Sequence, residues 1–200
     1  MKKIPLKNTD GTPEKTNGFC PQTPFLYGTY KEDGRPNFGL FNWFSYCWDG
    51  ELHVMCCIGG AKLTKDRIHA TGVFSANLVT EQMLPLADWF GSNPGYETDK
   101  RIDGLSIERG AALNVPTLAD SPYTYELEVK QNIPLDEGEI FICRIANILI
   151  DERLTDETAS VDERFKLVSP VLLTGTERYY GVTPNALGKW NQWKNTKPAL

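Results

Sequence analysis

The chain has 200 residues, of which 40% are hydrophobic and 24% charged, and its formal net charge is −5. This length suits one domain with a sizeable core, and the acidic balance argues against general nucleic-acid binding, which needs a basic surface. No apolar run approaches the roughly 18 residues of a membrane-spanning helix, and the polar start of the chain is unlike a secretion signal, so we expect a cytoplasmic protein.

The five cysteines are odd in number and fall mostly within strand patterns, which predicts reduced thiols. A zinc site made of Cys47, Cys56, Cys57 and His53 is disfavoured, because adjacent residues in a strand point to opposite faces and no C-x-x-C pair occurs. We expect these thiols to act as small buried hydrophobic groups.

Residues 1–23 are polar and rich in proline and glycine, which predicts an N-terminal arm that packs on a partner subunit. The segment FLYGTYK, Phe25 to Lys31, reads as the first strand. Asp33-Gly34 then predicts a tight turn, since glycine tolerates positive φ and aspartate can hydrogen-bond to its own backbone.

The next segments predict an antiparallel hairpin. Pro36 to Trp48 is rich in aromatic residues and reads as one long strand, Asp49-Gly50 is a second tight turn, and Glu51 to Ile58 alternates apolar and polar side chains. Gly59-Gly60 should end the ladder. On the long strand Trp43 would share a face with Gly39, so this face could lie against a planar ligand, although core packing is the alternative role for Trp43.

A short helix is expected from Lys65 to Ala70, with the Thr64 hydroxyl as its N-terminal cap. Free amides at a helix start, a threonine hydroxyl and the nearby Lys62 form an arrangement that binds anions such as phosphate. The alternative is that Thr64 only caps the helix and Lys62 is a solvated surface charge. The strand Gly72 to Val79 follows.

The rest of the chain continues with alternating strand and loop signals. Its expected elements are an amphipathic helix within Thr80–Phe90, a loop at Gly91–Thr98, an irregular stretch at Leu105–Pro122, paired strands at Tyr123–Gln131 and Glu139–Ile150, a charged surface excursion at Asp151–Lys166 and a last strand within Val168–Val182. The tail 184–200 carries Trp190 and Trp193, and we expect it to lie against its own or a neighbouring subunit.

Five short segments together resemble the flavin reductase-like proteins of the FMN-binding split-barrel fold, including flavoredoxins. They are DGRPNFGLFNW, AKLTKDRI, TGVFSANLV, Asp99-Lys100 and Arg178-Tyr179-Tyr180, in the family's order over roughly Phe25 to Gly181. The resemblance implies a mainly β, antiparallel, Greek-key-like split barrel of about six strands with a few short helices at residues 24–183. It also implies a homodimer with non-covalently bound FMN near the interface.

The resemblance implies a role for each candidate cofactor-binding residue. Lys62, Leu63 and Thr64 would bind the phosphate, Asn77 the ribityl or phosphate end, and Lys100 would lie near the flavin ring, where the alternative is a surface lysine. The other implied residues line or border the ring: Gly39, Asn42, Trp43, Phe44, Ser45, Tyr179 and Tyr180. Strand alternation lets only one of the two tyrosines face inward, and rim packing is their alternative role.

The chain departs from the family at the turn Leu135 to Glu139. Many NAD(P)H-dependent members carry a histidine motif there, whereas this chain has acidic residues, which would disfavour an anionic dinucleotide. Neither His53 nor His69 lies in the matching segment. We therefore favour an FMN-binding electron carrier reduced by a donor protein. An NAD(P)H-dependent flavin reductase and a flavin-binding module without turnover remain as alternatives.

Overall fold

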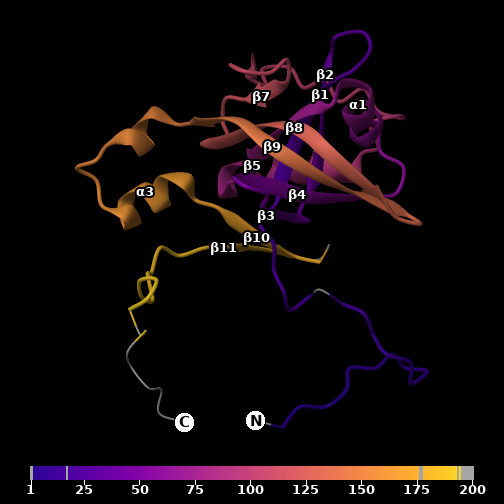
Figure 1. Cartoon of the computed structure of the whole chain (residues 1–200), viewed down its shortest axis with the longest axis vertical. Coiled ribbons are helices and arrows are strands. Elements are labelled where there is room, and N and C mark those ends of the chain that lie inside the picture. The colour runs from indigo at the N-terminus through magenta and orange to yellow at the C-terminus, as the bar shows by residue number, and fades with distance from the viewer. Residues whose placement is uncertain (1, 17, 176–177, 193, 195–200) are drawn as a thin grey trace.

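A seven-stranded antiparallel sheet forms the framework of the computed structural model, which describes residues 2–16, 18–175, 178–192 and 194. The spatial order of its strands is β2-β1-β5-β8-β9-β4-β3 (Figure 1). Their bounds are Phe25–Tyr30 (β1), Pro36–Phe41 (β2), Phe44–Trp48 (β3), Leu52–Gly59 (β4), Val73–Leu78 (β5), Tyr123–Pro134 (β8) and Gly138–Ile150 (β9). The mainly β, antiparallel fold predicted from the sequence is confirmed.

The predicted single strand from Pro36 to Trp48 is wrong, because the ladder breaks at Asn42-Trp43. β2 pairs with β1 and β3 pairs with β4, so these consecutive strands lie at opposite edges of the sheet. A link of two residues spans only about 10 Å. The sheet must therefore curl until its edges approach each other at this link, and this seam is the split of the barrel.

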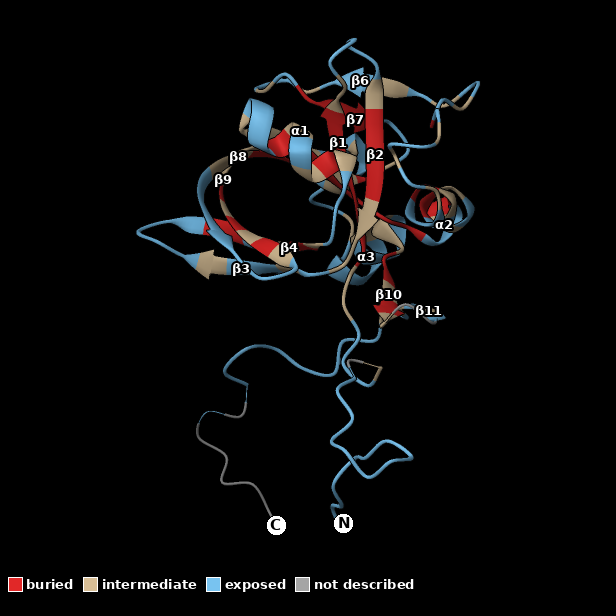
Figure 2. Ribbon diagram, turned by 90° about the vertical axis from the view of Figure 1, so that its right-hand side faces the viewer, coloured by how far each residue is buried: buried red, intermediate tan, exposed pale blue. Residues whose placement is uncertain are grey.

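Two hydrophobic cores pack on the two faces of β1. Phe25 and Tyr27 point into the barrel, and Leu26 points to the opposite side. The second core is covered by the helix α2 (Leu84–Ser92), which lies beside β2 in Figure 2. A 3₁₀ turn η1 (Glu81–Met83) precedes it, so that Pro85 falls in the first turn of α2, where its missing N–H costs no hydrogen bond.

The predicted hairpin of Tyr123–Gln131 and Glu139–Ile150 is confirmed, and it is longer than expected. β8 extends to Pro134, and β9 already begins at Gly138. Irregularities in the register between them bend the pair. This length lets the two strands join the half-barrel of β1, β2 and β5 to that of β3 and β4.

The stretch 105–122, expected to be irregular, contains two short strands, β6 (Ile107–Arg109) and β7 (Pro116–Leu118). The loop between them is held by Glu126 of β8, whose side chain is 0% exposed. Its carboxylate accepts hydrogen bonds from the amides of Ala111, Ala112 and Leu113 and from Asn147 Nδ2. A buried carboxylate with four donors is well compensated for its loss of water.

The C-terminal part of the domain also differs from the expectation. The charged excursion folds into a 3₁₀ turn η2 (Glu152–Thr155) and a helix α3 (Val161–Val168). Ser160 and Glu163 form a capping box at the start of α3. The predicted last strand is wrong, because the chain forms a hairpin of β10 (Val171–Thr174) and β11 (Arg178–Gly181). Gly175, with φ +58°, begins the turn that a single strand would lack.

Both terminal segments extend away from the barrel on the same side (Figures 1 and 2). The tail prediction is not met within one chain, since Trp190 is 94% exposed and Trp193 lies outside the described residues. Packing against a second subunit stays a prediction for the tail and for the N-terminal arm. None of the described helices is long and apolar enough to cross a membrane.

We predict that Glu126→Gln lowers the free energy of unfolding by about 2 to 3 kcal/mol, because an amide would turn one donor toward the loop amides and weaken the remaining bonds. Urea unfolding followed by circular dichroism measures this change. Glu108→Gln is the matched control, since Glu108 lies on β6 with an exposed side chain. Equal stability of the two variants would contradict the anchoring role of Glu126.

Candidate functional site

The seam between β2 and β3 lies beside the start of the helix α1 (Leu63–Thr71). Cys57 of β4 donates its backbone N–H to the carbonyl of Trp43 at 3.0 Å, and a methyl group placed on Gly59 would lie 3.7 Å from the indole. The indole, 50% exposed, therefore covers the end of β4. Asn42 donates to the carbonyl of Gly175 at 3.3 Å and ties the seam to the β10–β11 hairpin.

Two hollows flank this seam. The first, of about 70 Å³, lies at the start of α1, and the residues lining it include Gly39, Leu63, Thr64, Gly95 and the two lysines Lys62 and Lys100. The second, of about 210 Å³, lies against β3 and β4, and the residues lining it include Trp43, Phe44, Ser45, Met55 and Cys57. The fold thus brings most of the predicted site residues to one region, but divides them between two hollows. Since the long strand is broken, Trp43 and Ser45 do not continue the strand face of Asn37 and Gly39.

Thr64 does not cap α1, which corrects the prediction from the sequence. The helix begins at Leu63 with Lys62 as the capping residue, and no side chain bonds to the first-turn amides. The Thr64 side chain is instead buried and accepts a hydrogen bond from Asn37 Nδ2 at 3.0 Å. Since intrahelical acceptors do not exist for the first amides of a helix, those of α1 keep their capacity to bind an anion.

Gly39 lies in a closely packed part of the wall of the first hollow, on the side of β2. A methyl group at this position would lie 2.8 Å from the Phe41 ring and 3.1 Å from Thr64 Oγ1. Asn37, two residues earlier, carries a buried Oδ1 with no hydrogen-bond partner among the described residues. A methyl group at Gly95 would come within 2.9 Å of this atom. An unpaired buried acceptor therefore lies beside the hollow.

Lys100 is a buried cation rather than a surface lysine, with 7% of its area exposed. Its ammonium donates to the carbonyls of Phe38 at 3.0 Å and Phe90 at 2.7 Å. Burial, with the nearby Lys62 and Lys31, lowers the pKa of Lys100 to about 8. Its ammonium thus joins β2 to α2 and adds positive charge to the wall of the first hollow.

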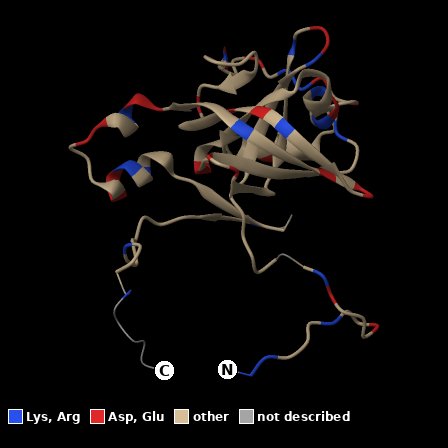
Figure 3. Cartoon of the chain, viewed as in Figure 1, with Lys and Arg blue, Asp and Glu red and all other residues tan. Residues whose placement is uncertain are grey.

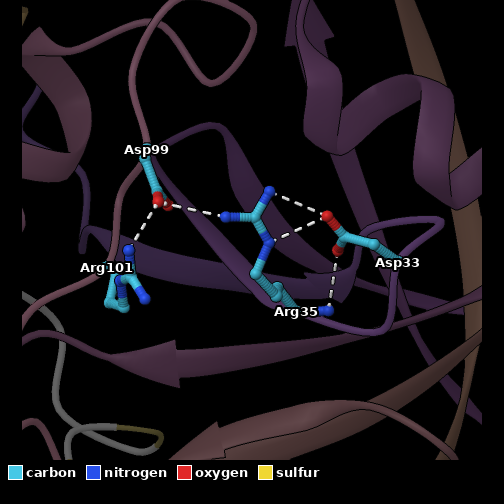
Figure 4. A network of polar contacts seen from close by, with 4 residues as sticks. All are labelled: Asp33, Arg35, Asp99 and Arg101. Carbon is cyan, nitrogen blue, oxygen red and sulfur yellow. Dashed lines mark hydrogen bonds and ion pairs between the residues drawn. The ribbon is translucent and has the colours of Figure 1, made fainter.

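An ion-pair network holds the segment that carries Lys100 (Figure 4). Asp99 accepts from Arg35 at 3.0 Å and from Arg101 at 3.3 Å, and Arg35 also pairs with Asp33 in the β1–β2 turn. These side chains are 44% to 73% exposed, so each pair stabilises the fold only weakly. Their effect is to orient the backbone just before Lys100.

Asn77 is not available to a ligand, which corrects its predicted role. It is fully buried in β5, and its Nδ2 donates to the Leu26 carbonyl at 2.9 Å and to Ser75 Oγ at 3.0 Å. Its Oδ1 accepts from the Leu118 amide at 2.9 Å and from the Thr124 hydroxyl at 3.1 Å. These four bonds use the full capacity of a side-chain amide, so Asn77 connects strands.

The structure places Tyr179 and Tyr180 on β11, and neither side chain lines either hollow within the described part of the chain. Tyr179 donates its hydroxyl to Asp88 of α2 at 3.2 Å, and burial together with Asp88 raises the pKa of Tyr179 to about 12. Tyr180 is half exposed. Their predicted contact with the ring is not supported by this position.

Sequence reasoning missed one histidine contact. His69 near the end of α1 lies with its Nε2 2.6 Å from Glu139 Oε2, and Asn132 donates to the other oxygen of this buried carboxylate. The helix thereby brings a histidine to the acidic turn at Leu135 to Glu139. No spacing in the sequence indicates this contact, because the residues are 70 positions apart.

The profile of the flavin reductase like domain matches residues 18–182. The chain belongs to this family. Among solved structures, flavoredoxin from Methanosarcina acetivorans has a TM-score of 0.81 at 19% identity, with 97% of this chain and 98% of that chain covered. An FMN-binding protein from Thermus thermophilus has a TM-score of 0.74 at 20% identity, with 94% and 100% covered.

A third structure, the Streptomyces globisporus C-1027 NADH:FAD oxidoreductase, has a TM-score of 0.66 at 16% identity and covers 84% of this chain and 89% of that chain. Because all three identities are 20% or lower, these structural comparisons establish the fold and nothing about function. Comparison with curated protein sequences found no match. The family assignment confirms the resemblance recognised in the sequence, and the split-barrel fold of this flavin reductase-like protein agrees with it.

We predict that Lys100→Met lowers the free energy of unfolding by about 1 to 3 kcal/mol at pH 7, because two buried carbonyls lose their donor. The pKa of Lys100 is about 8 when folded, against about 10.4 for a free lysine, so the unfolded state binds more protons between these values. The wild-type stability should therefore rise relative to the variant as the pH increases from 8 to 10. Urea unfolding at several pH values measures both effects.

The exposed Lys130 of β8 offers the control, as Lys130→Met should change neither the stability nor its pH dependence. A Lys100→Met variant whose stability runs parallel to wild type across this pH range would show that the ammonium is solvated.

Proposed function

We propose that this protein binds FMN non-covalently and passes electrons through it. The observation that carries the proposal is the pair of lysines beside the uncapped start of α1, next to a seam with an exposed indole. Two of the similar structures are named a flavoredoxin and an FMN-binding protein, which supports the same cofactor here. Bound FMN would supply the capacity to take up and release one or two electrons.

The residues present fit the phosphate group of FMN. Lys62 would pair with the phosphate, and the amides of Leu63, Thr64 and Lys65 would donate to its oxygens. At Gly39 any side chain would collide with Phe41 and Thr64, so glycine is required in this wall of the hollow. Lys100 keeps its ammonium near this end through its two carbonyl bonds. The cations and the helix start thus act on the same hollow.

The remaining parts of the cofactor would lie along the seam. Asn42, Trp43, Phe44 and Ser45 would line the flavin ring, since three of them line the second hollow. The unpaired Oδ1 of Asn37 could accept from a ribityl hydroxyl, which would replace the role first assigned to Asn77. This assignment uses groups whose hydrogen-bonding capacity is free, whereas Asn77 has none left.

The source of electrons separates two candidate functions. The acidic turn at Leu135 to Glu139 favours a carrier that receives electrons from a donor protein, because Asp136 and Glu137 are exposed there. The second candidate is an NAD(P)H-dependent flavin reductase. It is favoured by the name of the Streptomyces globisporus relative, and by His69, which pairs with Glu139. A module without turnover is the third candidate, and it would bind flavin without reducing it.

We further propose a cytoplasmic homodimer. The exposed indole of Trp43 and the exposed Met55 border the second hollow, and an apolar border of this kind suits coverage by another subunit. The free cysteines, such as the buried Cys56 and Cys143, suit a reducing compartment. Analytical ultracentrifugation at several protein concentrations tests the dimer, and a monomer at all of them would contradict it.

An absorbance experiment tests the function. The protein is mixed with FMN, desalted, and treated without oxygen with NADH, with NADPH and then with reduced ferredoxin. We expect retained flavin bands that only the protein donor bleaches. Bleaching by a nicotinamide would establish the reductase, bands that no donor bleaches would indicate the module, and loss of all flavin would refute FMN binding.

We predict that Lys62→Ala weakens FMN binding about 10-fold, because it removes a charge-assisted hydrogen bond worth roughly 1.5 kcal/mol or more. Lys62 is exposed, so the variant should keep its stability, and quenching of flavin fluorescence measures the dissociation constant. Lys130→Ala makes the same change of charge away from the site. If the two variants bind FMN equally well, the phosphate site lies elsewhere.

A further inference from the structure

A hollow of about 660 Å³, larger than the two at the seam, lies outside them. Its walls are the barrel strands β1, β3, β5 and β8, the helix α3, the strand β10 with the residue before it, the residue after β11, and the end of the N-terminal arm. Figure 1 shows α3 and β10 on the side of the barrel where β3 lies. A volume of this size is typical of sites for small organic ligands.

The lining of this cavity is aromatic and carries no charged side chain among the described residues. Six aromatic side chains line it: Phe25, Phe44, Tyr46, Tyr123, Tyr125 and Phe165. Phe25 and Phe44 stack with their ring centroids 4.2 Å apart, and Phe44 lies 5.5 Å from Tyr125. Figure 3 shows charged residues on loops, on helices and on the long strands of the sheet, while the β10 ribbon carries none. A wall of this kind accepts flat apolar rings and rejects ions.

The polar side chains that line the cavity are Gln22, Thr23, Ser45, Tyr46, Tyr123 and Tyr125. Two of these tyrosines form a pair. Tyr46 and Tyr125 form a short hydrogen bond with each other. One hydroxyl donates in such a pair, so the proton of the other stays free to donate to a ligand. Burial, and next the hydrogen bond with Tyr46, raises the pKa of Tyr125 well above its usual value, so the Tyr125 hydroxyl keeps its proton.

The cavity is next to the strand that would line the flavin ring. Gln22, Phe44 and Ser45 line both this cavity and the hollow at Trp43. A ligand in the cavity would therefore lie one side chain away from the seam. This position is suitable for a molecule that exchanges electrons with a cofactor at the seam.

We propose that this cavity binds a flat, uncharged aromatic carbonyl compound, whose oxygen accepts a hydrogen bond from the Tyr46–Tyr125 pair. Its role as an electron acceptor rests on the function proposed above. A naphthoquinone, as one member of this class, would take two electrons and two protons from reduced FMN and leave as the hydroquinone, which returns the flavin to its oxidised form.

Equilibrium dialysis of the full-length protein with three related compounds tests the binding. The probe is 2-acetylnaphthalene, which is neutral, has a carbonyl group and does not react with thiols. 2-Ethylnaphthalene lacks the oxygen, and 2-naphthoate carries a negative charge. We expect the ketone to bind best, the hydrocarbon about 3- to 10-fold more weakly, and the anion at least 10-fold more weakly. Equal binding of the ketone and the anion would overturn the proposal.

Paired variants assign the binding to this cavity. In a single variant the remaining tyrosine of the pair could still donate, so both are replaced. Tyr46→Phe/Tyr125→Phe should weaken ketone binding about 3- to 10-fold and leave binding of the hydrocarbon unaffected. Val182→Trp should abolish binding of both by filling the cavity. Val161→Trp on the exposed side of α3, where Val161 is 71% exposed, should change neither. Full binding by Val182→Trp would place the ligand elsewhere and overturn the proposal.

Repeating the dialysis with FMN separates this proposal from the proposed function. Unchanged ketone affinity in the presence of bound FMN supports two adjacent sites. Displacement of the ketone by FMN would show that the flavin occupies the cavity and would overturn the proposal. If the protein binds no FMN at all, the proposed function fails, while the affinities of the three compounds still decide what the cavity binds.

Discussion

The link Asn42-Trp43 is the constraint on which the rest of this structure depends. These two residues join the strands at the two edges of one sheet, so the sheet has to close on itself at this link. Closure places the aromatic rings of Phe25 and Phe44 in contact across the seam and brings β4 under Trp43. The same closure brings the end of β2 to the start of α1. The candidate cofactor site is thus a direct consequence of how the barrel closes.

Burial of charge is the second recurring theme. Lys100 and Glu126 are both withdrawn from water, and each is compensated by several backbone groups: two carbonyls for the lysine and three amides for the glutamate. In each case the charged group holds a loop or helix against the sheet. Asn77 does the same with a neutral amide. These three polar side chains of the interior therefore join elements, and the groups proposed to hold the cofactor lie at the seam and at the start of α1.

The strands and turns with clear local signals were predictable. Asp33-Gly34 and Asp49-Gly50 form turns with both glycines at positive φ, and the alternation in Tyr123–Gln131 and Glu139–Ile150 marks the long hairpin. Lys62, Leu63 and Thr64, which the family resemblance assigned to the phosphate, line one hollow, and Lys100, which it placed near the flavin ring, lines the same hollow. The break after Phe41 escaped prediction because aromatic residues continue on both sides of it, so local composition shows no boundary.

The sequence by itself determined the class of fold, the long β8–β9 hairpin and the family, because these follow from alternation, turn residues and ordered motifs. Only the tertiary structure decided what each polar side chain does. Thr64 bonds to Asn37 instead of capping its helix, Asn77 is fully used by other strands, and His69 meets Glu139. These roles depend on partners that are distant in sequence, and a side chain's capacity for hydrogen bonds is assigned only when the packed sheet brings those partners within reach.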